Sequence, residues 1–410
     1  MTFCGQDDTI ASIQIRLNIP ICVLSVKMEE RKMKKFVALM MALMMCLGCL
    51  AGCGAKDEDA GKIKIGGTAP LTGGAAIYGN AAKRGAEIAV EEINALGGLQ
   101  FVLKYEDDAH DAEKAVNAYN AVKDWGMQLS LGSVTSGPGL ATSVKNYEDS
   151  IFALTPSAST DGYPEGKDNV YQMCFADTNQ GSASAQYIYE NQLGTKIAII
   201  YQNDIDYSTG IYNTFVTKAQ ELGLEIVSTT TFITDAKDFS VQITDAKNSG
   251  ADLVFLPIYY EEASLILAQC AAIDYAPKFF GVDGMDGILT LEGFDISLAE
   301  GVMLLTPFSA DAQDDLTKNF VAKYQEKYGE IPNQFAADAY DCIYAIYQAC
   351  KTAGVTADMS AADINAKLKE QFNTMTFSGL TGENMTWTDG YVSKSPKGMV
   401  IENGVYVGLD

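Results

Sequence analysis

Histidine is almost absent from this sequence, in which His110 is the single one among 410 residues. Because histidine is the commonest base of hydrolase triads and a frequent metal ligand, one position leaves little room for either chemistry. Basic residues are also few, with 29 Lys and Arg against 53 Asp and Glu and a formal net charge of −24. Such a charge repels phosphate backbones, so we expect no nucleic-acid partner.

Nucleotide-binding and hydrolase motifs are missing as well. No GxxxxGK(S/T) occurs, no GxGxxG follows a predicted strand, and no GxSxG is present. One acidic cluster, Asp107, Asp108, His110 and Asp111, offers ligands for a cation, yet its place between a predicted strand and a predicted helix favours a polar loop with a helix-capping aspartate. We therefore expect no metal, no cofactor and no enzymatic activity.

Cysteines are present, but their spacing carries no signature. Beyond residue 53 they are Cys174, Cys270, Cys342 and Cys350, which match neither a zinc site nor a CxxC pair. The last two lie eight residues apart on one predicted helix, too far for a disulfide. Buried free thiols are expected.

Residues 31–53 have the features of a secretory signal: a basic run, an apolar stretch, and small residues at the end. The last four, Leu50-Ala51-Gly52-Cys53, resemble the lipobox of bacterial lipoprotein signals. The resemblance implies that Cys53 becomes the first mature residue and carries a diacylglyceryl thioether, which anchors the chain to the membrane. An ordinary cleaved signal or an apolar N-terminal helix is the alternative.

The charged region of this signal lies far from Met1, and a second apolar stretch, 19–26, precedes it. We therefore predict that translation begins at Met28 or Met33. The front of the chain then divides into a non-native extension (1–32), a lipoprotein signal peptide (33–52) and a polar tether (53–61).

From Lys62 onward, short β-branched or aromatic runs alternate with amphipathic helical stretches, which predicts an α/β fold built of βαβ units on parallel sheets. The alternation forms two series of similar size, so two Rossmann-like lobes are expected. The predicted strands are 62–69, 101–105, 128–131, 151–154, 196–201, 225–232, 253–258, 279–282 and 302–305. The predicted helices are 81–96, 112–125, 140–147, 182–192, 211–222, 240–248, 263–273, 314–328, 335–352 and 361–372.

Hydroxyl and small residues gather where predicted strands end, the place at which open α/β sheets bind ligands. They fill the segments 70–79, 132–138 and 155–160, whose hydroxyls and backbone N–H groups suit a bound carboxylate. In the second series, Asp283 follows the strand 279–282 and can face an ammonium group. Tyr207 and Tyr259 offer aromatic walls.

At these residues the chain resembles the leucine/isoleucine/valine-binding proteins of branched-chain amino-acid ABC transporters, which are type I periplasmic binding proteins. The resemblance runs from Lys62 nearly to the end of the chain, and three segments carry it most clearly. They are Ile65 to Gly73 with Tyr78-Gly79, Thr155 to Ser159, and Gly281-Val282-Asp283-Gly284.

The resemblance implies a set of ligand-binding residues. Ser136, the backbone of Ser157 and Ala158, and Ser159 would hold the α-carboxylate of an amino acid, while Asp283 would take its ammonium group. Tyr78, Tyr207 and Tyr259 would line or close the cleft. Relatives often have threonine at the position of Ser159 and, in some members, glutamate at that of Asp283, which keeps the chemical role but changes the reach.

The predicted architecture is two lobes joined by a hinge of three crossovers. Lobe 1 comprises 62–176 with 308–385, and lobe 2 comprises 177–307 with 386–410. Capture of an amino acid, branched-chain or otherwise aliphatic, would close the hinge. The resemblance further implies a monomer on the extracytoplasmic face of a bacterial membrane, which delivers its ligand to ABC permease subunits. The alternatives are an amide, urea-like or aromatic-acid ligand, and an enzyme or ligand sensor on the same scaffold.

Overall fold

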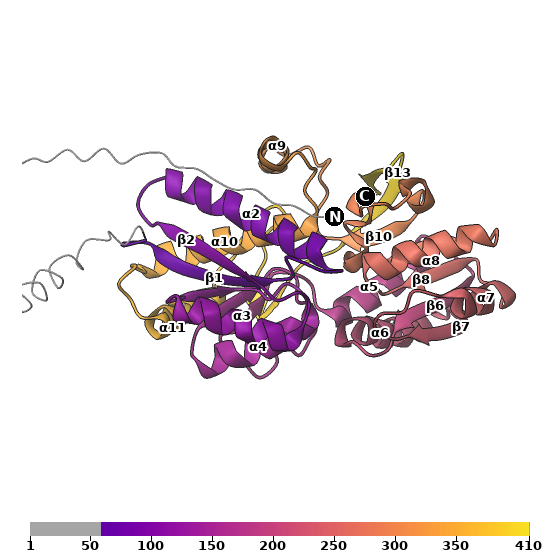
Figure 1. Ribbon diagram of the computed structural model, residues 1–410, viewed down its shortest axis with the longest axis horizontal. Helices are drawn as coiled ribbons and strands as arrows, with labels where there is room; N and C mark the ends of the chain where they lie inside the picture. The colour runs from indigo at the N-terminus through magenta and orange to yellow at the C-terminus, as the bar shows by residue number, and fades with distance from the viewer. Residues whose placement is uncertain (1–58, 410) are drawn as a thin grey trace, which may run out of the picture. The chain divides into compact units, whose positions relative to one another are not determined.

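A computed structural model describes residues 59–409. The predicted extension, the signal peptide, Cys53 and most of the tether lie outside the described residues. From Gly61 onward the chain forms one unit with two large β-sheets and one two-stranded sheet (Figure 1). The fold is therefore the predicted α/β type.

The first sheet contains five strands, all parallel, in the order β2-β1-β3-β4-β5. Its central strands are buried along their whole length, which explains their continuous apolar sequence. Only β5 has no counterpart among the predicted strands. The bounds are β1 Ile63–Ala69, β2 Phe101–Asp107, β3 Leu129–Leu131, β4 Phe152–Thr155 and β5 Val170–Gln172.

The second sheet has seven strands in the order β14-β13-β10-β9-β8-β6-β7. Strands β6 to β10 pair in parallel, whereas β13 runs antiparallel to both β10 and β14. This hairpin comes from the tail of the chain, beyond the last predicted strand and helix. The bounds are β6 Lys196–Gln202, β7 Glu225–Phe232, β8 Leu253–Leu256, β9 Lys278–Gly281, β10 Met303–Thr306, β13 Lys397–Glu402 and β14 Val405–Gly408.

Helices cover both faces of each sheet. On the first sheet, α10 packs with both α2 and α11, and α3 packs with α4 (Figure 1). On the second, α5 packs with α6, and α7 packs with α8. The bounds are α2 Ala76–Ala95, α3 Ala112–Asp124, α4 Ser136–Glu148, α5 Asp177–Glu190, α6 Asp206–Leu222, α7 Ser240–Asn248, α8 Tyr260–Ala272, α9 Asp315–Tyr328, α10 Gln334–Ala353 and α11 Ala361–Phe372.

Five helices, α2, α4, α5, α6 and α8, begin between three and five residues before their predicted starts. In each case the first turn is rich in glycine, hydroxyl, acidic or tyrosine residues, which do not follow the apolar helical period. Gly79 in α2 shows why a glycine stands in one of these turns: a Cβ there would lie 2.0 Å from the carbonyl oxygen of Pro70. Each of these five unpredicted first turns follows the loop at the carboxyl end of a strand.

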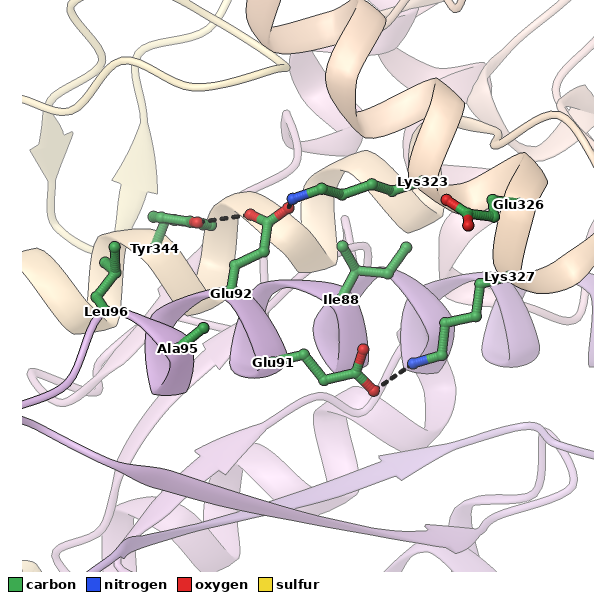
Figure 2. Close-up of a pocket in the computed structure, with 9 residues that line it drawn as sticks. All are labelled: Ile88, Glu91, Glu92, Ala95, Leu96, Lys323, Glu326, Lys327 and Tyr344. Carbon is green, nitrogen blue, oxygen red and sulfur yellow. Dashed lines mark hydrogen bonds and ion pairs between the residues drawn. The ribbon is translucent and has the colours of Figure 1, made fainter.

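Helix α9 is held to α2 by charged side chains (Figure 2). Lys323 pairs with Glu92 and Lys327 pairs with Glu91, and the Tyr344 hydroxyl donates to Glu92 at 2.6 Å. These residues line a surface hollow of about 770 Å³ along the C-terminal half of α2. The hollow lies far along the helix from Tyr78 in the first turn, so it is not the cleft that the sequence predicts.

A small hairpin follows residue 386, where the sequence predicts the last lobe boundary. Strands β11 (Trp387–Thr388) and β12 (Tyr391–Val392) form a small hairpin that packs against β5. The indole Nε1 of Trp387 donates to the carbonyl oxygen of Gln172 at 2.8 Å. This hairpin therefore lies with the first sheet, and the chain crosses to the second sheet only at β13.

Cys174, Cys270, Cys342 and Cys350 are free and buried, as predicted. Asp111 accepts a hydrogen bond from the backbone N–H of Lys114 at 2.8 Å and caps α3, which confirms its predicted capping role. Within residues 59–409, no helix combines the length and the apolar character needed to cross a membrane.

Candidate ligand-binding cleft

The predicted site residues come from the carboxyl ends of strands in both sheets. Five of them line one enclosed cavity, while three are buried without lining it. The five are Tyr78, Ser157, Tyr207, Tyr259 and Asp283, which share the cavity wall with Val134, Thr135, Gly284 and Phe335. The three are Ser136, Ala158 and Ser159.

On the first-sheet side, the loop after β4 is organised by the hydroxyl of Thr155. Its Oγ1 accepts from the backbone N–H of Ala158 at 2.9 Å and from that of Ser157 at 3.2 Å. The same hydroxyl donates to the carbonyl oxygen of Ser133 at 2.6 Å. The backbone donors predicted for a carboxylate therefore bind Thr155 in this arrangement.

Two serine hydroxyls lie on the same side. Ser136 is the first residue of α4, and its Oγ accepts from the backbone N–H of Thr160 at 3.3 Å. Ser159 is 1% exposed, and its hydroxyl lies beside the buried carboxyl of Asp177, to which it offers a hydrogen bond.

On the second-sheet side, Asp283 is buried and accepts a hydrogen bond, but no lysine or arginine of residues 59–409 pairs with its charge. The Tyr207 hydroxyl donates to its Oδ1 at 2.6 Å. Burial raises the pKa of Asp283 to about 6, while hydrogen bonds from Tyr207 and Gln180 act in the opposite direction. A buried carboxyl with a raised pKa is one that a cationic partner would stabilise.

Asp177, the first residue of α5, is a second buried carboxyl in this region. It is 1% exposed and lies beside the Ser159 hydroxyl. Burial raises the pKa of Asp177 well above the usual range and repulsion from Asp283 adds to the shift, while a hydrogen bond from Ser159 acts in the opposite direction. Neither Asp177 nor Asp283 forms an ion pair with a lysine or arginine of residues 59–409, so this end of the cavity is strongly acidic.

Aromatic rings fill most of the space between the two sheets. Tyr207 stacks on Tyr259 with ring centroids 4.5 Å apart, and Tyr78 meets Tyr259 edge-on at 5.5 Å and Phe335 at 4.4 Å. The enclosed cavity that remains is only about 10 Å³. That volume holds about one water molecule, so any larger ligand needs the rings to move or the lobes to separate.

Hydrogen bonds cross between the two sheets at Tyr78. Its hydroxyl donates to the carbonyl oxygen of Gly284 and accepts from the backbone N–H of Tyr260 at 3.2 Å. The Tyr260 hydroxyl in turn donates to the carbonyl oxygen of Gly74 at 2.6 Å. The structure therefore shows a closed arrangement, in which the loop after β1 contacts α8 and the turn after β9.

His110 also reaches this region. Its Nδ1 lies 2.9 Å from the hydroxyl of Thr135, and its ring meets that of Tyr259 edge-on at 5.5 Å. Burial lowers the pKa of His110, which favours the neutral ring. The sequence placed this histidine in a polar loop and gave no sign that it would contact a cleft residue.

Sequence reasoning missed two residues that join the site from α10. Phe335 packs on Tyr78, and the side-chain amide of Gln334 donates to the carbonyl oxygen of Asp283 at 2.8 Å. They lie more than 250 residues along the chain from Tyr78. Local pattern shows only an aromatic residue at the start of an apolar helix, which is typical of a core position.

Two α/β units, with hydroxyls on one side and buried carboxyls on the other, define a two-lobed solute-binding protein. Sequence comparison agrees, since residues 62–398 match the family described as periplasmic binding protein. A Leu/Ile/Val-binding protein homolog of Brucella melitensis is 31% identical over 309 residues, which are 73% of this chain and 81% of that protein.

Solved structures agree on the fold. The branched-chain amino-acid transporter substrate-binding protein LivJ of Streptococcus pneumoniae, in complex with isoleucine, is 28% identical with a TM-score of 0.76, over 85% of this chain and 99% of that one. A solute-binding protein of an ABC transporter from R. palustris, in complex with benzoate, is 20% identical with a TM-score of 0.77, over 85% and 96%. The second likeness concerns the fold alone.

The chain belongs to the periplasmic binding protein family, in its type I form, as the sequence predicts. It is an extracytoplasmic solute-binding protein of an ABC transporter, and its relatives bind solutes rather than act as enzymes.

Proposed function

We propose that the protein captures an aliphatic α-amino acid, of the branched-chain class, between its two lobes. The observation that carries the proposal is Asp283, a fully buried carboxyl without a basic partner in the described chain, which lines the same cavity as Ser157 of the opposite sheet. A ligand that carries both an ammonium and a carboxylate group suits these two sides. The names of the Brucella and Streptococcus relatives support this class.

We assign each residue a role according to the sheet from which it reaches the cavity. Asp283 binds the ammonium group, and the buried carboxyl of Asp177 adds negative potential at the same end. The carboxylate binds the hydroxyls of Ser159 and Ser136 and the backbone N–H groups of Ser157 and Ala158, once these N–H groups are released from Thr155.

The apolar side chain of the ligand takes the place that aromatic rings now fill. Tyr78, Tyr207 and Tyr259 surround that place and close over the ligand when the lobes approach. We place the hinge where three crossovers leave the lobes, near residues 176 and 307 and, for the third, between β12 and β13. Closure then buries the ammonium group of the ligand against Asp283 and its carboxylate against the hydroxyl and N–H donors of the other lobe.

Isothermal titration with three molecules of one shape tests the proposal. Leucine carries both charged groups, 4-methylpentanoate lacks the amine, and 3-methylbutylamine lacks the carboxylate. We expect saturable binding of leucine and at least a hundredfold weaker binding of the other two, because each leaves one buried polar side unpaired. Equal binding of leucine and 4-methylpentanoate would exclude the assigned role of Asp283.

The same titration includes benzoate and a short amide as rival ligands. The benzoate complex from R. palustris has the same fold, which is the reason to include an aromatic acid. Binding of benzoate without leucine would move the protein to the aromatic-acid class. The transporter role would stand, but the ammonium role of Asp283 would not.

We further propose that Cys53 anchors the protein by a lipid and that the closed form delivers its ligand to the permease. The sequence Leu50-Ala51-Gly52-Cys53 supports the anchor. Labelling bacterial cells with an alkynyl palmitate should mark the wild-type chain and leave Cys53→Ser unmarked. A label retained by Cys53→Ser would place the lipid elsewhere.

A further inference from the structure

The single histidine of the chain lies next to the candidate cleft without lining it. His110 belongs to the loop between β2 and α3, on the first-sheet side. Its Nδ1 is 2.9 Å from the hydroxyl of Thr135, a residue that lines the enclosed cavity. Its ring meets that of Tyr259, which lines the same cavity from the second-sheet side. His110 therefore contacts one cavity-lining residue from each lobe.

The backbone of this loop holds His110 in place. Ala109 and His110 both have positive φ, at 47° and 59°, and neither is glycine. Such a conformation costs free energy in a residue with a side chain and persists where surrounding bonds impose it. Asp107 Oδ1 accepts from the backbone N–H of Ala109 at 2.9 Å, and Asp108 Oδ1 accepts from that of His110 at 3.0 Å. The loop therefore presents the imidazole in a fixed direction.

The contact with Thr135 fixes a hydroxyl at the start of α4. Thr135 is the N-cap residue of that helix, but its side chain caps no backbone N–H. Its hydroxyl lies against His110 instead. The next residue, Ser136, is one of those to which we assign the carboxylate of the ligand. His110 thus sets the rotamer of a cavity-lining side chain from outside the cavity.

The contact with Tyr259 crosses between the lobes. Tyr259 is the N-cap residue of α8, and its ring stacks on that of Tyr207 with centroids 4.5 Å apart. The Tyr207 hydroxyl in turn donates to Asp283, the proposed partner of the ammonium group. Burial raises the pKa of Tyr259 well above its usual value, and a hydrogen bond from the backbone of Ser136 acts in the opposite direction. His110 therefore supports a ring that bonds across the cleft and stacks on the partner of Asp283.

We propose that His110 is a positioning residue for ligand capture. From outside the cavity it fixes the hydroxyl of Thr135 and supports the ring of Tyr259 as the lobes close, and it does so as the neutral imidazole. It needs no contact with the ligand itself. This inference rests on the proposed function, because it assigns a role in the capture of the same ligand.

The surroundings of the ring favour its neutral form in the closed arrangement. Burial lowers the pKa of His110, while the charge of Asp111 acts in the opposite direction. Three carboxylates of the same loop accept hydrogen bonds from hydroxyl or backbone donors; they are Asp107, Asp108 and Asp111. On the side of the second lobe, the acidic groups that act on Tyr259 are Asp177, Asp283 and Glu262.

Closure is therefore coupled to the protonation of His110. When the lobes separate, Tyr259 leaves the ring, and the pKa of His110 returns toward its ordinary value of 6.5. Since the closed arrangement lowers that pKa, a protonated ring opposes closure, and ligand affinity falls as the pH drops below about 6.5. At pH 5 the loss has an upper limit of about 30-fold, reached where only the neutral form closes.

A histidine spectrum of the empty protein gives the first test. His110 is the only histidine of the chain, so a protein grown with 15N-labelled histidine and purified without a histidine tag gives one pair of ring-nitrogen signals. The bond to Thr135 lies within the first lobe and does not depend on closure. We expect Thr135→Val to shift the Nδ1 signal of His110 without any ligand. An unchanged signal would refute the proposal, whatever the cleft binds.

Three substitutions of His110 then separate its two contacts in leucine titrations. His110→Gly removes both contacts and suits the positive φ, His110→Asn keeps a polar group near the Thr135 hydroxyl, and His110→Phe keeps a ring against Tyr259. We expect His110→Gly to weaken leucine binding by about tenfold or more. The other two should lose less, since each contact contributes about two- to tenfold.

The neighbouring residue supplies a matched control. Ala109→Gly changes the other left-handed position of the loop and should keep the wild-type affinity. Unchanged melting temperatures confirm that each variant folds. Wild-type affinity in His110→Gly would refute the role of His110, and so would equal losses in His110→Gly and Ala109→Gly, because flexibility of the loop would then be the cause.

The pH dependence tests the requirement for a neutral ring. Asp283 also titrates near pH 6, so the wild type is compared with His110→Asn, in which only the Asp283 effect remains. Between pH 7.5 and pH 5 the wild type should lose several-fold more leucine affinity than His110→Asn, and equal losses would refute the requirement. Absence of leucine binding by the wild type would refute the proposed function instead, whereas the Thr135→Val spectrum is read without ligand.

Discussion

Replacement of Asp283 by asparagine should weaken the ligand complex and stabilise the empty protein. In the complex, the variant leaves the ligand's ammonium group without its buried countercharge. Truncation of one partner in such a pair costs about 2–5 kcal/mol, which corresponds to roughly 30-fold to several thousand-fold in affinity. Leucine binding by titration calorimetry measures this loss.

In the empty protein the effect has the opposite sign. Burial raises the pKa of Asp283 from 3.8 to about 6. A folded pKa above the unfolded value means that the ionised carboxyl destabilises the fold, and the cost grows as the pH rises from about 4 to about 6. At 1.36 kcal/mol per unit, the full cost above pH 7 is about 3 kcal/mol.

Urea unfolding at two pH values shows whether Asp283→Asn stabilises the empty protein as expected or destabilises the fold in general. Asp283→Asn without ligand should be more stable than the wild type at pH 7.5 and equal to it at pH 4. Asp124→Asn, a change at an exposed position of α3, is the matched control and should alter neither quantity. An Asp283→Asn protein that keeps its leucine affinity, or that loses stability at pH 7.5, would refute the reasoning.

Three further substitutions have expected outcomes. Gly85→Ala should destabilise the fold by about 1–3 kcal/mol in urea, because a Cβ there would lie 1.9 Å from a backbone oxygen of α10; Gly137→Ala, with open space, should not. Lys394→Met should cost about 3–5 kcal/mol at pH 8 by leaving Asp338 buried and unpaired. That cost should shrink at pH 5, since burial raises the pKa of Asp338 to about 7. Tyr78→Phe should weaken leucine binding about tenfold in calorimetry, since it removes two hydrogen bonds across the cleft.

The fold could be predicted from the sequence wherever apolar residues follow a regular period. The helices Ser240–Asn248 and Ala361–Phe372 begin and end where the pattern places them. Prediction failed for the first turns of α2, α4, α5, α6 and α8, because polar and glycine residues there are selected for contact with loops rather than for a core stripe. It also missed β5, whose three residues are too short to show a period.

The candidate site was predictable on each side separately. The positions of strand ends in an open α/β sheet predict Ser157 and Asp283, the second series also offers Tyr259, and the family resemblance adds Tyr78. What local pattern cannot show is contact between distant segments, such as Phe335 with Tyr78.

The closed aromatic cluster also bears on selectivity. Because the rings of Tyr207 and Tyr259 already stack, an incoming side chain replaces one set of apolar contacts by another. The gain per additional methylene group is then at most about 0.8 kcal/mol, or about fourfold in affinity. In the proposed complex, pairing of the ammonium group with Asp283 contributes several times more. We therefore expect the charged groups to select amino acids as a class and the rings to discriminate only weakly among leucine, isoleucine and valine.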